Sequence, residues 1–133
     1  MALTRRPLDG YPDSWGAHRA SVFGHAGPTS YVQVTYGPVA GGDVAVASEA
    51  GLKYFEYLDS GVTDTGNFLV QSIPTQPSTG APLGQGAAVN YRLRWIAQRT
   101  ATIGGQAQTA GSEAVATTNL SAEVVLLLAV GQK

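Results

Sequence analysis

The sequence predicts an all-β domain, built as an antiparallel β-sandwich or a small barrel. Short segments rich in β-branched and aromatic residues recur along the chain, and Gly and Pro turn signals separate them. Residues 89–96 alternate apolar and polar side chains, which is typical of a strand with one face in a core. The 133 residues are enough for one domain with a core of its own, and they contain no internal repeat.

The first 29 residues are predicted to form an extended N-terminal arm. Seven Gly and Pro residues disfavour a long helix or strand in this segment. Tyr11 and Trp15 are nevertheless too apolar for a free tail. We therefore expect the arm to pack its aromatic side chains either on its own domain or on a neighbouring subunit, with residues 30–133 forming the β-sandwich domain.

The remaining chain divides into predicted strands and two long connections. Strands are expected at residues 30–36, 44–48, 52–58, 68–73, 89–96 and 122–130. A helix over residues 44–59 is the alternative for two of them, but Gly51 in its middle would cost about 1 kcal/mol relative to Ala. Pro74 is expected to end the fourth strand, and a continuation of the fifth through residues 97–103 remains open.

The two connections are rich in Gly, Ala, Thr and Pro. Residues 75–88 form a loop near or beyond the usual limit of about 12–15 residues, so it is either a free surface loop or one that becomes ordered against a partner. Residues 104–119 have little to bury and are expected to form the second connection, with a weak strand at most near residues 114–116.

The C-terminal segment 124–130 is apolar at every position. A strand that is apolar on both faces lies in the centre of a sandwich or at a subunit interface. Leu126 and Leu128 are therefore candidate interface residues. The segment is far shorter than the roughly 20 residues that a membrane helix requires. No apolar segment follows the positively charged start of the chain, so we do not expect export by a signal peptide.

The charge content of the chain is unusually low. Charged residues make up 13% of the sequence, about half of the usual quarter. This shortage suggests that a partner covers part of the surface, or that neutral polar residues coat it. The net charge of −1 provides no basic field for nucleic acid or anionic lipid, so neither is an expected partner.

The residue types that carry catalysis or bind metals are sparse. No cysteine is present, which removes disulfides, thiol catalysis and Cys-ligated metals. His18 and His25 lie in the Gly- and Pro-rich arm and are expected to be exposed loop residues rather than ligands of a metal, which needs three or four ligands. No Gly-x-Ser-x-Gly motif or phosphate-binding glycine loop occurs. We therefore expect no enzyme activity, no cofactor and no metal.

Arg92 and Arg94 alternate with Tyr91 and Trp95 in the clearest predicted strand. Basic residues among aromatic ones can bind single-stranded nucleic acid. In a strand, however, neighbouring side chains point to opposite faces, so one face cannot offer both stacking and charge. Tyr91 and Trp95 are therefore predicted core residues, while Arg92 and Arg94 face solvent or an acidic patch on a protein partner.

From Gly51 onward the sequence resembles the decoration, or cement, proteins of the heads of tailed double-stranded DNA phages. The resemblance lies in residues 51–57, 65–70, 91–96 and 120–125, and covers about two thirds of the chain. It implies a β-rich, frequently trimeric body without catalytic residues. Such a body lies on the outside of the capsid and bridges neighbouring major capsid proteins, often with an extended terminal arm.

The function predicted from these observations is that of a non-enzymatic structural protein of the virion. It would bind the major capsid protein and form a homotrimer. The expected contact residues lie in the arm, on the sheet and in the C-terminal strand: Tyr11, Trp15, Arg92, Arg94, Leu126 and Leu128. One alternative is a tail, neck or fibre component of a phage. Another is a carbohydrate-binding β-sandwich, with Trp15, Tyr54, Tyr57 and Trp95 as candidate stacking residues.

Overall fold

The computed structural model describes residues 18–37, 39–75 and 90–132. The strands are β1 (His18–Ala26), β2 (Asp43–Ala45), β3 (Tyr54–Leu58), β4 (Gly61–Val62), β5 (Phe68–Thr75), β6 (Asn90–Ala97), β7 (Ala101–Ile103), β8 (Gln106–Gln108) and β9 (Val124–Gln132), and one short 3-10 helix is η3 (Ala47–Ala50). Every strand pair is antiparallel, and no α-helix occurs in these ranges. The predicted all-β antiparallel fold is therefore confirmed. None of the described helical residues forms a segment that could cross a membrane.

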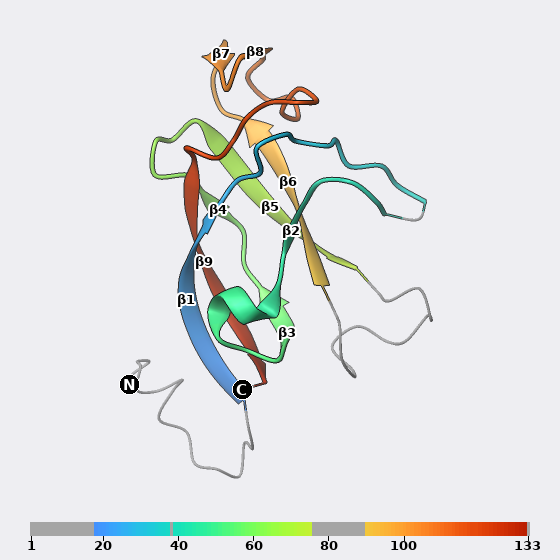
Figure 1. The fold of residues 1–133 in the computed structure, drawn as a ribbon, viewed down its shortest axis with the longest axis vertical. Coiled ribbons are helices and arrows are strands. Elements are labelled where there is room, and N and C mark those ends of the chain that lie inside the picture. The colour runs from blue at the N-terminus through green and yellow to red at the C-terminus, as the bar shows by residue number, and fades with distance from the viewer. Residues whose placement is uncertain (1–17, 38, 76–89, 133) are drawn as a thin grey trace.

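Two main sheets make up the body of the molecule. One has the strand order β1-β9-β3 and the other the order β2-β6-β5-β4. The hairpin β7-β8 forms a small third sheet and lies at the end of the molecule away from the C-terminal end of β9 (Figure 1). The arrangement places β9 in the centre of its sheet, with Leu127 buried on one side of the strand and Leu126 exposed on the other.

The core lies between the two main sheets and is dominated by aromatic rings. Phe55 of β3 stacks on Phe23 of β1 with a centroid distance of 6.2 Å. The same Phe55 meets Tyr91 of β6 edge-on at 5.6 Å, and this contact joins the two sheets. Phe68 and Trp95 form a second edge-on pair at 5.8 Å. Trp95 is fully buried, so its predicted place in the core is confirmed.

The strands at β3, β5, β6 and β9 agree with the predicted segments, with one difference at Pro74. β5 continues past this residue to Thr75, with Pro74 opposite Tyr91 of β6. β4 pairs only with Leu69 and Val70, so no strand of the described residues borders β5 on its other side at Pro74. A proline is tolerated there because its missing N–H interrupts no second ladder.

The prediction of an arm without a long strand is wrong for residues 18–26. These residues form β1, which pairs along its whole length with β9 from His18 opposite Gln132 to Ala26 opposite Val124. Phe23 and His25 point into the core from this strand. The two glycines that disfavoured a strand are accommodated, since Gly24 lies within the strand and Gly27 follows it. The other arm residues, 1–17, lie outside the described residues.

The strand predicted at residues 30–36 is also wrong. Only Thr35 forms a bridge, to Ala40, and the rest of the segment is irregular. Tyr31 and Val34 are buried, but the backbone bonds to loops instead of to a neighbouring strand: the N–H of Tyr31 donates to the carbonyl of Thr118. These two buried apolar residues, with two exposed residues between them, made the composition of the segment resemble that of a strand.

Two further expectations about connections are corrected. β6 ends at Ala97 and does not continue through residue 103, because β7 begins separately and returns as β8 through a turn at Gly104 and Gly105, both with positive φ. Residues 104–119 are not an unpacked connection, since Gln108, Ala114 and Thr118 in this segment are buried. The segment predicted as a strand at 44–48 contains the last two residues of β2 and the first two residues of η3. The loop predicted at 75–88 lies almost wholly outside the described residues.

Candidate functional site

The outer side of the β1-β9-β3 sheet is the candidate site, and strand register defines its members. Val125, Leu127 and Ala129 of β9 are buried in the core. Side chains alternate across a strand, so the intervening positions of β9 point to the opposite side. Residues directly opposite each other in an antiparallel pair share a face. Val22 lies opposite Leu128 and therefore belongs to this outer side.

β3 and β4 extend the same surface on the other side of β9. Tyr57 lies opposite Val130 after a register shift in β3, and so joins the outer side. Thr63 bridges to Val125 facing the core, which by alternation places Val62 on the outer side next to Leu126. We call this surface the outer apolar face; it consists of Ala20, Val22, Gly24, Ala26, Tyr54, Tyr57, Val62, Val124, Leu126, Leu128 and Val130.

The outer apolar face exposes large hydrophobic side chains. Leu126 is 70% exposed, Val22 66%, Val62 53% and Tyr57 50%. These four are half of the exposed large hydrophobic residues within the described ranges; three belong to the β1-β9-β3 sheet, and Val62 belongs to β4, which adjoins β9 through the Thr63 bridge. Single exposed apolar residues are ordinary, but a contiguous apolar patch marks an interaction surface. Of the predicted contacts, Leu126 and Leu128 both lie on this face.

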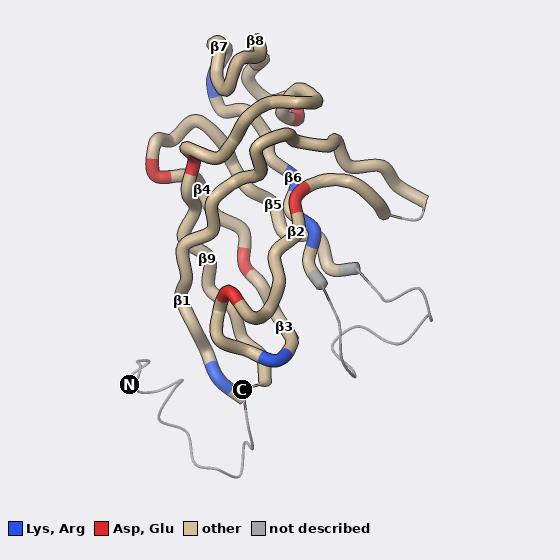
Figure 2. The backbone as a smooth tube through the Cα atoms, viewed as in Figure 1, with Lys and Arg blue, Asp and Glu red and all other residues tan. Residues whose placement is uncertain are grey.

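Charged groups border the outer apolar face without entering its centre. His18 at the start of β1 is exposed, and its Nδ1 lies 2.6 Å from Oε1 of Glu56. Asp59 follows β3, and the N–H of Asp64 donates to the carbonyl of Val124 at the far end of β9. Figure 2 shows Lys and Arg near the starts of β1 and β3, and acidic residues both in this half of the molecule and towards the opposite end of the sheet. Charged groups of both signs therefore border the face.

The structure does not bring the two predicted arginines to the same surface as Leu126 and Leu128. Arg92 and Arg94 belong to β6 in the other sheet. Arg92 donates from Nη1 to the carbonyl of Gly41 at 2.8 Å. The Nε of Arg94 lies 3.8 Å from Glu113 Oε1 and makes no hydrogen bond with the described part of the chain. Both side chains are half-buried, and they point away from the core.

Both histidines lie in strand β1 and not in a loop; His18 is exposed as expected, but the expectation of exposure is wrong for His25. This residue lies in β1, is only 5% exposed, and has both ring nitrogens occupied. Nε2 is 2.6 Å from Asp43 Oδ2 and Nδ1 is 2.6 Å from Glu49 Oε1. Trp95 Nε1 donates to the same Asp43 oxygen at 3.2 Å. The cluster joins β1, β2, η3 and β6 across the core.

The electrostatics of this cluster favour a charged imidazole. Burial by itself lowers the pKa of His25, but the hydrogen bonds and negative charges of Asp43 and Glu49 outweigh this effect and raise the pKa above 6.5. An imidazole that faces two carboxylates must carry a proton on each nitrogen to donate to both. Because every partner is satisfied inside the protein, the cluster is a structural link between the elements and not a binding site. No group of three or more potential metal ligands occurs among the described residues.

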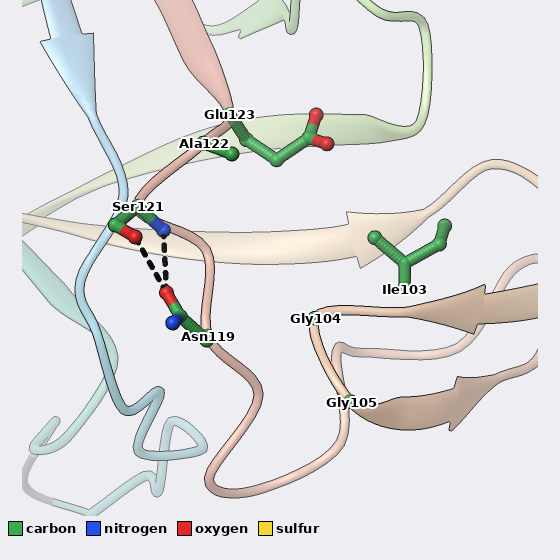
Figure 3. A pocket seen from close by; sticks show the side chains of 7 residues that line it. All are labelled: Ile103, Gly104, Gly105, Asn119, Ser121, Ala122 and Glu123. Carbon is green, nitrogen blue, oxygen red and sulfur yellow. Dashed lines mark hydrogen bonds between the residues drawn. The ribbon is translucent and has the colours of Figure 1, made fainter.

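A pocket of about 440 Å³ lies between the β7-β8 turn and the segment before β9 (Figure 3). Its polar side chains are already engaged. Asn119 Oδ1 accepts hydrogen bonds from the backbone N–H of Ser121 at 3.0 Å and from its hydroxyl at 2.6 Å. Glu123 accepts hydrogen bonds from Thr65 and Asn67. The residues that line the pocket include no histidine, lysine or arginine, and the Ser121 hydroxyl donates to Asn119 and not to the Glu123 carboxylate.

The candidate sugar-stacking residues do not form one platform. Trp95 is buried in the core and is unavailable to a ligand, which removes it from the carbohydrate alternative. Tyr54 and Tyr57 belong to β3 on the outer apolar face, where the hydroxyl of Tyr57 donates to Asp59. Tyr11 and Trp15 lie outside the described residues.

No protein-family model, no curated protein and no solved structure matches this chain. The outer apolar face is therefore identified from the geometry of the sheet and not from related proteins. Sequence reasoning found its central strand but missed Val22 and Val62, and it considered Tyr57 only as a sugar-stacking residue. Alternation in residues 20–26 was the signal that could have identified Val22, but the glycines of that segment obscured it.

Proposed function

We propose that this chain is a non-enzymatic structural protein that binds other protein surfaces in an assembly. The observation that carries this proposal is the outer apolar face. There, Leu126 of β9 and Val22 of the neighbouring strand β1 each expose most of their surface. Burying apolar surface is favourable by about 25 cal/mol per Å². A face of this kind is costly to leave in water and is suited to permanent coverage.

The composition of the chain supports the same function. Charged residues make up only 13% of the sequence, which is little for a protein whose whole surface must stay hydrated. The two main sheets present different outer sides. One is apolar, and the other carries Arg92 and Arg94. A cementing protein needs more than one contact surface, and two chemically different sides meet that need.

Phage capsids are the assembly that we propose for this protein. The proposal rests on the resemblance of residues from Gly51 onward to head decoration proteins, together with the low charge of the chain. In this role the chain lies on the outside of the shell and joins neighbouring major capsid proteins. Arg92 and Arg94 are the residues proposed to face acidic groups of the capsid, because arginine pairs with carboxylates through two parallel hydrogen bonds.

Co-sedimentation with capsid shells tests this function. The shells are assembled from the major capsid protein encoded with this chain, and the purified chain is titrated onto them. We expect saturable binding at a fixed number of copies per shell, and weaker binding of a variant with Arg92→Ala and Arg94→Ala. Absence of binding to intact and expanded shells would refute the capsid role.

The arm needs a separate experiment with a defined boundary. Residues 18–26 form a strand of the sheet, so a deletion that reaches residue 28 would remove β1 and damage the fold. Deleting residues 1–17 leaves all described strands in place. If the arm with Tyr11 and Trp15 reaches a neighbouring subunit, this deletion weakens shell binding while the melting temperature stays unchanged.

A further inference from the structure

We propose that η3 detaches from β1 when the His25 imidazole loses one of its two protons, because Glu49 leaves the ring while Asp43 keeps its hydrogen bond to it. The chain then has a second native form at alkaline pH, in which both main sheets persist and η3 is released. This conformational change is independent of the proposed capsid role.

His25 lies where an edge strand of one main sheet meets an edge strand of the other. β1 is at the edge of its sheet, and β2 is at the edge of the second sheet. The His25 side chain is only 5% exposed, with Nε2 2.6 Å from Asp43 of β2 and Nδ1 2.6 Å from Glu49 of η3. η3 follows β2 and lies beside β1 (Figure 1). One imidazole therefore attaches two elements to β1, one through each ring nitrogen.

The charges that act on the imidazole come from Asp43 and Glu49. From β6, Trp95 provides an uncharged indole N–H that donates to Asp43, and from β9 the apolar Val125 lies opposite His25. The two carboxylates raise the pKa of His25 above 6.5, so the ring loses its proton on the alkaline side of this value. Two carboxylates then face a neutral ring, and a buried charge that has lost its partner is unfavourable.

A neutral imidazole cannot keep both contacts. It has a single N–H, so it donates to only one of the two carboxylates. The other nitrogen presents its lone pair to a carboxylate oxygen at hydrogen-bond distance, and this arrangement is repulsive. Deprotonation therefore breaks one contact, and the surroundings of the two carboxylates determine which one.

Asp43 is the carboxylate that stays with the ring. Its side chain is 10% exposed, whereas that of Glu49 is 32% exposed. Asp43 Oδ2 also accepts the Trp95 indole N–H at 3.2 Å, and Oδ1 accepts the backbone N–H of Val44 at 2.8 Å. Moving Asp43 would leave the buried indole N–H without an acceptor, which is costly. Glu49 can turn into solvent, so the proton stays on Nε2 and leaves Nδ1.

η3 depends on the Glu49 contact because its other contacts are weak. It is a 3-10 helix of four residues, and so short a helix is stable mainly through contacts with the rest of the fold. The same carboxylate accepts the N–H of Val46, which precedes η3, through Oε2 at 3.0 Å. This bond is exposed, so water can replace it when the carboxylate turns away. The buried side chains of η3 are only the methyl groups of Ala47 and Ala50, so losing the Glu49 contact loosens the helix.

NMR of the ring nitrogens of His25 shows which contact is kept. Long-range ¹H–¹⁵N spectra distinguish a protonated ring nitrogen from an unprotonated one. His18 is the other histidine of the chain, and its signals are assigned with His18→Gln. We expect both nitrogens of His25 to be protonated at acidic pH and Nδ1 alone to lose its proton as the pH rises. Loss of the proton from Nε2, or retention of both protons until the sheets unfold, overturns the proposal.

Backbone amide exchange of the unmodified chain, corrected for the intrinsic effect of pH, measures the release of η3. The N–H groups of Gly51 and Leu52 donate to the carbonyls of Ser48 and Ala47 at the end of this helix. Their protection should fall at least about tenfold across the titration of His25, whereas the amides of β9 stay protected. Unchanged protection at η3, or an equal loss in η3 and β9, overturns the proposal, because the latter is unfolding of the whole domain.

Glu49→Gln is the decisive variant, because an amide fits the neutral ring. Its oxygen can accept the N–H of Val46 while its nitrogen donates to the unprotonated Nδ1, in the places of Oε2 and Oε1. The amides of η3 should therefore stay protected at the pH where the original chain releases them. Glu56→Gln, beside the exposed His18, is the matched control and should behave like the original chain. Loss of η3 protection in Glu49→Gln with the original pH dependence overturns the proposal.

Discussion

His25 Nε2 lies 2.6 Å from Asp43 Oδ2, and this contact joins the edge strand β1 to β2 of the opposite sheet. Glu49 holds the other ring nitrogen at the same distance. The three groups form a link between the sheets that depends on the imidazole keeping both of its protons.

The first prediction is that stability falls as the pH rises through the pKa of His25. The folded-state pKa is raised above the ordinary value of 6.5, so folding takes up protons and favours the charged form. The stabilisation of the folded state by protonated His25 is complete below about pH 6.5, and it is lost as the pH rises through the raised folded-state pKa. Melting temperatures measured from pH 6 upward, at about half-unit steps, should decline in the original chain.

The control for this prediction is His25→Gln, which removes the titrating group. The variant should be less stable than the original chain at the acidic end of the range, and its melting temperature should change less with pH. A pH profile of the same slope in both proteins would show that the histidine is not the group responsible.

The second prediction concerns the link between Tyr31 and β6. The Tyr31 hydroxyl donates to Glu113 Oε2 at 2.7 Å and accepts the backbone N–H of Trp95 at 3.1 Å. Tyr31→Phe keeps the ring but leaves the buried N–H of Trp95 without its acceptor. A buried polar group that loses its partner costs about 1–3 kcal/mol, and chemical denaturation should show a loss of this size.

Tyr36→Phe is the matched control, since Tyr36 is exposed and lies in the same segment. Its stability should stay within about 0.5 kcal/mol of the original. Equal effects of the two substitutions would contradict the role assigned to the Tyr31 hydroxyl.

The third prediction tests the close approach of β3 to the end of β9. A Cβ atom placed on Gly131 would lie 2.1 Å from the carbonyl oxygen of Tyr54, whereas one on Gly24 would meet only side-chain atoms, the nearest at 3.6 Å. Neither glycine has a positive φ, so the two differ mainly in this contact. Gly131→Ala should lower the unfolding free energy by about 1–3 kcal/mol through forced movement of the backbone, and Gly24→Ala should change it little. Similar stabilities of the two variants would argue against the described β3-β9 register.

The sequence was sufficient for the strands whose pattern is local. Residues 89–96 alternate strictly, and 124–130 are continuously apolar, so β6 and β9 could be predicted without knowledge of their neighbours. β1 could not, because its stability depends on a partner about a hundred residues away and its glycines signal a turn. The prediction of a strand at residues 30–36 was wrong in the opposite way: Tyr31 and Val34 are buried in the core, but the segment that carries them is irregular.

The candidate site also combines residues that the local sequence predicts with residues that depend on distant partners. Leu126 and Leu128 were predicted as contacts from a strand that is apolar at every position, and both lie on the outer apolar face. Val22 and Val62 become part of that face only through cross-strand pairing, which local sequence does not specify. The role of His25 was missed for this reason too, because Asp43 and Glu49 are 18 and 24 residues away.

The fourth prediction separates the two faces of β9 by adjacent substitutions. Leu127 is fully buried and Leu126 is 70% exposed in the same strand. Leu127→Ala removes core contacts and leaves a cavity, which costs about 2–5 kcal/mol. Leu126→Ala should change the unfolding free energy of the monomer by no more than about 0.5 kcal/mol. Urea denaturation measures both changes in unfolding free energy. The protein concentration is kept well below any association midpoint, because association between copies would otherwise add to the apparent stability. A large loss at Leu126 under these dilute conditions would place its side chain in the domain's own core and remove it from the proposed interface.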